Sequence, residues 1–275
     1  MNARLVGELA RLDTVQQTLE QTALPEPFAG LVAANRKALD AATKAEDERV
    51  RLYRTRNAFI GIETLSFIAA HPAAAKDVNA LAELWEARKA SFDSLPSIEG
   101  GSLLATALTE AGANRAEKLY RASLPYGRVS GAASGLYYLA EAEASARFSQ
   151  FVAATPQEAR EQAPSEAAIR AAIERLDDEV LALFEKDQTS PAAIPASAAL
   201  KEARELLDRG SLAGATLLAA EAKLAIARRS GDAVAVSVTA EPPVGDSILE
   251  TFRATNDSAV DHHVLPFLAA LRSAR

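Results

Sequence analysis

Apolar residues recur every three or four positions along most of the chain, which is the spacing that places side chains on one face of an α-helix. The clearest stripe comes first and predicts an amphipathic helix over residues 3–22. Leu24-Pro25-Glu26-Pro27 ends it, because proline has no amide hydrogen and clashes with the preceding helical turn. Later stripes predict helices over 28–70 (with or without a break near Glu46), 78–92, 102–123, about 130–153 and 165–184, a helical hairpin over 199–232, and two short helices near 248–252 and 260–271.

One segment departs from the helical spacing. Residues 233–240, AVAVSVTA, place a valine at every second position, and this period predicts a β-strand. The chain offers no second strand with which it would pair. We therefore expect either an extended connector or a strand that pairs with another copy, which would make the protein a homo-oligomer through 233–240.

Together these elements predict an all-α protein of about nine helices. The connections are short, so we expect neighbouring helices to pack antiparallel, as an irregular bundle or as a repeat-like array of helical hairpins. Gly210 lies in the turn of the predicted hairpin, where a left-handed helix end favours glycine. We expect three regions: a helical region over 1–153, a helical-hairpin region over 165–228 packed on the first as one continuous domain, and an extended segment with C-terminal helices over 229–275.

Composition supports the helical prediction and excludes several functions. The chain is 49% hydrophobic and rich in alanine, which is the best helix former. Its net charge is −7 and no run of Lys/Arg is longer than a pair. We expect no nucleic-acid partner, because such proteins need clustered cations to displace counterions from phosphates. The absence of cysteine removes thiolate metal sites and cysteine nucleophiles.

The length of the apolar runs and the first residues of the chain bear on the compartment. No apolar run approaches the ~20 residues needed to span a bilayer, so we expect no membrane insertion. The start, MNARLVGELARLD, lacks the apolar core of a signal peptide, which predicts a cytoplasmic protein as written. Met1 is the only methionine, however, as it would be if a start codon preceded a trimmed mature chain. The alternative is therefore a periplasmic or secreted protein whose signal peptide has been removed.

Histidine and carboxylate side chains gather near the C-terminus. Imidazole and carboxylate groups are suitable ligands for zinc, iron or manganese. On a helix, the two aspartates share a face while the two adjacent histidines point about 100° apart, so the four do not converge. We keep them as a weak alternative metal site and expect no metal, no cofactor and no catalytic residue, since no HExxH, Glu-x-x-His or G-x-S-x-G motif occurs. The four residues are Asp257, Asp261, His262 and His263.

The stretch YGRVSGAASGLYY spaces Gly127, Gly131 and Gly135 four residues apart. It has neither the spacing nor the lysine of a phosphate-binding loop. Three glycines inside one helix would cost about 3 kcal/mol relative to alanine, so we expect a bend over 124–131 and a new helix after it.

The tyrosines of this stretch are the main functional signal. On the helix after the bend, Tyr137 falls on the core face and Tyr138 on a stripe of small residues that lets another helix approach closely. Tyrosine and arginine are over-represented at interaction hot spots. The structural alternative is that these tyrosines fill the gaps beside small residues and bond nearby carbonyls. The candidate partner- or ligand-binding residues are Trp85, Tyr120, Tyr126, Arg128 and Tyr138.

Three functions remain open from the sequence. The first is a non-catalytic scaffold or protein–protein interaction protein that uses the surface around Tyr120–Tyr138. The second is a small-ligand-binding protein with a pocket between helices, lined by Trp85, Tyr126, Arg128 and Tyr138. The third is an enzyme with a dispersed site. We favour the first, because a large helical surface carries no motif for catalysis, cofactor or nucleic acid.

Overall fold

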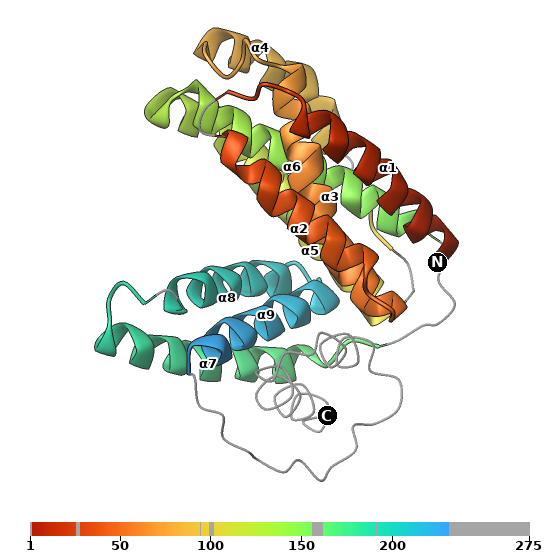
Figure 1. The fold of residues 1–275 in the computed structure, drawn as a ribbon. Helices are drawn as coiled ribbons and strands as arrows, with labels where there is room; N and C mark the ends of the chain where they lie inside the picture. The colour runs from red at the N-terminus through yellow and green to blue at the C-terminus, as the bar shows by residue number, and fades with distance from the viewer. Residues whose placement is uncertain are drawn as a thin grey trace. The chain divides into compact units, whose positions relative to one another are not determined.

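The computed structural model describes residues 2–25, 28–93, 95–98, 102–155, 162–190 and 192–230. Within these ranges the chain forms nine α-helices and two short 3-10 helices, and no strand (Figure 1). The prediction of an all-α fold is therefore confirmed. The strand predicted over 233–240 and the two predicted C-terminal helices lie outside the described residues.

The chain divides into two compact units, Met1–Ser97 with Gly112–Pro156 and Ile98–Ala111 with Gln157–Arg275. We call them unit 1 and unit 2. Our division into 1–153, 165–228 and 229–275, with the first two regions forming one domain, stays a prediction. Unit 1 holds α1 (Asn2–Glu20), η1 (Phe28–Gly30), α2 (Leu31–Thr43), α3 (Glu48–Ala70), α4 (Val78–Arg88), η2 (Lys89–Phe92), most of α5 (Leu103–Ser130) and α6 (Ala132–Ala153). Unit 2 holds the first turns of α5, with α7 (Glu166–Lys186), α8 (Ala193–Asp208) and α9 (Leu212–Ser230).

Helix α6 is the most deeply buried helix of unit 1. It packs along α3, and α3 in turn packs against α1 and α2 (Figure 1). On one face of α6, Phe148 is inaccessible and lies 5.4 Å from the ring of Phe59 in α3. On the other face, Ala142 and Ser145 are equally inaccessible. The stripe of small residues therefore lets neighbouring helices cover α6 on both sides, as the sequence predicted.

A buried carboxylate ties three helices of unit 1 together. Glu63 of α3 is 5% exposed, and its two oxygens accept from different arginines. Arg11 of α1 donates to Oε1 at 2.6 Å, and Arg147 of α6 donates to Oε2. Arg11 also pairs with Glu8 one turn earlier. Because Glu63 makes two charge-assisted bonds, its burial is compensated rather than left as an isolated charge.

Several helix ends follow from local sequence. The predicted option of a break near Glu46 is realised, because Asp47 accepts hydrogen bonds from the amides of residues 49 and 50 and starts α3. Ser165 caps α7 by accepting from the Ala168 amide at 3.3 Å. Gly210 has a φ of 77° and ends α8 as predicted. There the Ser211 amide donates to the Leu206 carbonyl at 2.9 Å, which is the Schellman arrangement.

Two predicted boundaries were wrong. The bend expected over 124–131 is helical, and α5 runs through Pro125 to Ser130. The proline removes one helical bond, and the following turn packs closely against α4 and α6, where Gly127 meets Leu81 and Gly135. Helix α8 begins at Ala193 rather than 199, with Pro195 in its first turn, where amides have no helical acceptor in any case.

Unit 2 is built on three helices, α7, α8 and α9, which pack against one another in all pairs. The α8–α9 hairpin is the one predicted around Gly210. Its α9 begins beside Glu110 of α5, whose Oε2 accepts from the Gly214 amide at 2.7 Å. Burial raises the pKa of Glu110, although bonds from the Gly214 and Ala213 amides act in the opposite direction. This carboxylate thus occupies the positive end of the α9 dipole.

Candidate functional site

The glycines and tyrosines of the sequence meet at the α5–α6 corner, which we define as residues 124–138. Helix α5 ends at Ser130 and α6 begins at Ala132, so the one residue Gly131 joins the two helices. Its φ of 98° is a conformation that residues with a Cβ rarely adopt, which explains the glycine. The turn is closed by the Gly131 amide, which donates to the Gly127 carbonyl at 3.1 Å.

Gly127 and Gly135 allow α5 and α6 to cross at very short range. A Cβ placed on Gly135 would lie 2.6 Å from the Cα of Gly127 and 2.7 Å from the carbonyl oxygen of Ser123. Leu81 of α4 fills the space beside both glycines, with its Cδ2 2.7 Å from the same Cβ position. The corner is therefore locked to α4 by packing, and its glycines serve close approach rather than phosphate binding.

Tyr126 and Tyr138 stack on each other at this corner. Their ring centroids are 4.7 Å apart and their planes differ by 18°. Tyr126 is 41% exposed, whereas Tyr138 is half-buried beneath it. Burial raises the pKa of Tyr138, and the charge and hydrogen bond of Tyr126 raise it further. Tyr138 is therefore a neutral hydroxyl at physiological pH, covered on one side by Tyr126.

Tyr120 and Trp85 belong to a separate aromatic cluster inside unit 1. Tyr120 is 7% exposed, and its ring stacks against Trp85 at 4.9 Å and against Phe92 at 4.3 Å. Trp85 Nε1 donates to the Tyr120 carbonyl at 3.0 Å, and the Tyr120 hydroxyl donates to the Trp85 carbonyl at 3.2 Å. These reciprocal bonds join α4 to α5. The five candidates are thus split between a packed cluster and the corner.

Val129 joins the exposed side of the corner, although the sequence did not single it out. It follows Tyr126 by three positions, so the two lie on one face of α5. Val129 is 87% exposed, and Arg128 beside it is exposed as well. The expected bend left no helical face on which to place Val129, which is why the sequence pattern missed it. Arg128 lies two positions after Tyr126 and therefore projects from a different face of α5. Tyr126, Val129 and Tyr138 form what we call the corner surface.

A second surface feature of unit 1 is an open groove between α1 and α2. Its volume is about 450 Å³. Leu9 and Leu39 form its buried floor, and Val6 stands at its rim with 53% of its surface exposed. None of the five sequence candidates is among the lining residues. The groove is lined by Val6, Leu9, Ala10 and Asp13 of α1, Leu39, Asp40 and Thr43 of α2, and Arg51 of α3.

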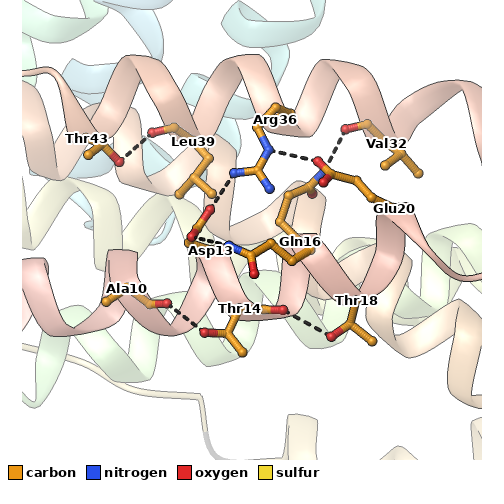
Figure 2. Close-up of polar contacts among 11 residues, drawn as sticks. Ala10, Asp13, Thr14, Gln16, Thr18, Glu20, Val32, Arg36, Leu39 and Thr43 are labelled. Carbon is orange, nitrogen blue, oxygen red and sulfur yellow. Dashed lines mark hydrogen bonds and ion pairs between the residues drawn. The ribbon is translucent and has the colours of Figure 1, made fainter.

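Arg36 of α2 joins the two helices beside this groove. Its guanidinium pairs with Asp13 and, at 2.8 Å, with Glu20 of α1. Gln16, which is fully buried, donates to Glu20 at 3.1 Å and to the Val32 carbonyl at 3.0 Å. Figure 2 shows this network lying between the two helices. The network fixes the spacing of α1 and α2 and hence the width of the groove.

Titratable groups give no sign of a metal centre in the described part of the chain. No three His, Asp or Glu side chains there come together in a way that would hold a metal ion. The weak alternative site at Asp257, Asp261, His262 and His263 lies outside the described residues. His71 ends α3, where its Nδ1 lies 2.8 Å from the Phe67 carbonyl oxygen.

A property of the helices and the comparisons with known proteins also bear on this chain. Of the helices described, none has both the length and the apolar character that crossing a membrane requires. No family model, curated protein or solved structure matches the chain. Function is therefore inferred from the geometry of this protein alone.

Proposed function

We propose that this protein is a non-catalytic binding protein that engages another protein through the corner surface. The observation that carries the proposal is the stacked pair of Tyr126 and Tyr138, with Val129 exposed on the same face as Tyr126. Single exposed apolar side chains need no explanation. Tyr126 and Val129 lie one turn apart on one face of α5, and Tyr126 stacks on a second aromatic ring, which is the kind of composition found at interaction hot spots.

The rigidity of the corner supports the same proposal. Gly127, Gly135 and Leu81 hold the backbone of α5 and α6 in one arrangement. A surface that is already held in its binding geometry loses little conformational entropy on association. Tyrosine adds to this advantage, because it offers a large contact area at the cost of few rotatable bonds.

The test is site-specific cross-linking in the source cell. A photoreactive phenylalanine analogue is placed at Val129 and, as a matched control, at Leu31, an exposed apolar residue of the same unit that is 38% accessible. We expect one protein to be linked from position 129 and not from position 31. Tyr126→Ser in the same chain should abolish the adduct.

The affinity for the partner identified by cross-linking then measures how much these side chains contribute to binding. Tyr126→Ala or Val129→Ser should weaken binding at least tenfold, about 1.4 kcal/mol, measured by calorimetry with both proteins purified. Equal adducts from positions 31 and 129, or unchanged affinity in both variants, would refute the proposal.

A further inference from the structure

Two tyrosine rings at the corner are held face to face by two different helices. Tyr126 comes from the end of α5 and Tyr138 from the start of α6, with ring centroids 4.7 Å apart and planes 18° from parallel. Burial raises the pKa of Tyr138, and the charge and hydrogen bond of the Tyr126 hydroxyl raise it further, so the two hydroxyls lie side by side. The ring carbons next to the two hydroxyls therefore lie close to each other.

No other pair among the five tyrosines, all of which lie in the described ranges, has this arrangement. Tyr137 adjoins Tyr138 in sequence, but their centroids are 6.5 Å apart and their planes differ by 57°. Tyr120 is enclosed between the rings of a tryptophan and a phenylalanine. Tyr53 has the guanidinium of Arg56 over its ring. Close parallel contact between two phenol rings is thus particular to the corner.

The same pair is accessible to an oxidant from solvent. Tyr126 is the most exposed of the five tyrosines, with 41% of its surface accessible. The chain has no cysteine and only one methionine, Met1, so sulfur side chains that would otherwise react with an oxidant are nearly absent. An oxidant that removes one electron at the surface of unit 1 therefore meets a phenol that already has a second phenol against its face.

We propose that Tyr126 and Tyr138 form an oxidative cross-linking site, at which a haem peroxidase with hydrogen peroxide joins the two rings as dityrosine. Each phenol loses one electron and its hydroxyl proton, and the unpaired electron spreads to the carbon beside the oxygen. These two carbons form a bond, and the hydrogen on each then moves to the phenol oxygen. The two electrons and two protons released reduce one hydrogen peroxide to two waters.

The corner favours this reaction because its backbone is already fixed. Gly127 and Gly135 bring α5 and α6 together, so the two radicals form in contact and need no encounter between separate chains. The product is a covalent bridge between the two helices at the surface. The inference rests on the ring geometry and does not require the proposed protein partner, so it is tested on the purified chain alone.

The test treats the full chain at low concentration with a haem peroxidase and hydrogen peroxide. Trypsin cleaves after Arg121, Arg128 and Arg147, which places Tyr126 in peptide 122–128 and Tyr138 in peptide 129–147. We expect these two peptides to be joined, with a mass below their sum by two hydrogen atoms and with fragment ions that place the link at Tyr138. The intact chain should show dityrosine fluorescence and keep the size of a monomer on a denaturing gel.

Phenylalanine variants keep each ring and remove its phenol. Tyr126→Phe or Tyr138→Phe should lower the yield of joined peptides by roughly tenfold or more, because one radical is lost from the stacked pair. Tyr137→Phe lies in the same tryptic peptide and should leave the yield unchanged. Unfolding the chain in urea before oxidation should lower the yield as well, because the stack is lost.

Three results would overturn the proposal. The first is the absence of dityrosine after peroxidase treatment of the folded chain. The second is an unchanged yield of joined peptides in Tyr138→Phe, which would place the link at another tyrosine. The third is dityrosine found only in chains of dimer size, which would show that the rings couple between molecules rather than within the corner.

Discussion

Gly135 of α6 and Gly127 of α5 face each other so closely that a Cβ on Gly135 would lie 2.6 Å from the Cα of Gly127. Real Cβ atoms do not approach other atoms so closely, so only glycine fits this crossing. The same pair receives Leu81 of α4 and thereby positions Tyr126 over Tyr138. This one contact therefore contributes both to the stability of unit 1 and to the shape of the corner surface.

Gly135→Ala is predicted to destabilise unit 1 by about 1–3 kcal/mol, the usual cost of overpacking a filled interior. The nearest atoms include the backbone of Gly127 and of Ser123, which cannot rotate away. The readout is urea unfolding followed by the fluorescence of Trp85, the only tryptophan in the chain, which lies in unit 1.

Gly7→Ala is the matched control for this substitution. Gly7 lies in α1 with no atom within 4 Å of a Cβ built there. Alanine should therefore stabilise the helix by up to about 1 kcal/mol. If Gly135→Ala and Gly7→Ala changed the free energy of unfolding in the same direction, Gly135 would not be the close contact described above.

Glu63→Gln is predicted to lower the free energy of unfolding of unit 1 by about 1–3 kcal/mol. The substitution keeps the shape of the side chain but weakens its bonds to Arg11 and Arg147, which come from two other helices. Trp85 fluorescence during urea unfolding again provides the measurement. Glu83→Gln removes a charge from the surface of the same unit and should change stability by less than about 0.5 kcal/mol.

The pH dependence of unit 2 should contain a contribution from Glu110. Burial raises the pKa of this carboxyl above its ordinary value of 4.5, so folding favours its protonated form. The stabilising contribution of the protonated carboxyl to the free energy of unfolding is fully present below pH 4.5. It is lost as the pH rises through the raised pKa. Relative to Glu110→Gln, the wild-type protein should therefore gain stability as pH falls from 7 towards 4.5.

Hydrogen exchange of α9 peptides, compared between the two proteins at each pH, measures this gain. Glutamine retains an oxygen that accepts from the Gly214 amide, so the bond itself is not removed. A difference in protection that does not vary with pH would show that the carboxyl has no raised pKa in the folded protein.

Gly210→Ala should destabilise the α8–α9 hairpin by about 1–2 kcal/mol through its backbone alone. Its φ is 77°, and no atom lies within 4 Å of a Cβ built there, so crowding plays no part. Gly210→Asn should cost less, because asparagine tolerates this conformation better. In thermal unfolding followed by circular dichroism, the protein with glycine at position 210 should have the highest Tm, the asparagine variant the next and the alanine variant the lowest.

Much of the candidate site could be anticipated from the sequence, and each feature that the sequence missed has an identifiable physical cause. The cluster of tyrosines and glycines was visible in the sequence, and Tyr126 and Tyr138 do meet. Tyr120 and Trp85 could not be assigned to the packed cluster, because that requires knowing that η2 brings Phe92 onto Tyr120. The α1–α2 groove was missed because a helical stripe predicts which face is buried, not how far its edge is covered.

The sequence by itself determined the helices and several of their ends. Apolar spacing and the left-handed helix end at Gly210 act within a few residues, so local pattern suffices to predict them. The caps that the structure shows, Asp47 and Ser165, are equally local. The continuation of α5 through Pro125 was decided by tertiary structure. Its local cost of one hydrogen bond and an internal glycine is offset by packing of Gly127 against Gly135 and Leu81. Contacts between residues distant in sequence outweigh local propensity there, and they determine which side chains the corner surface exposes.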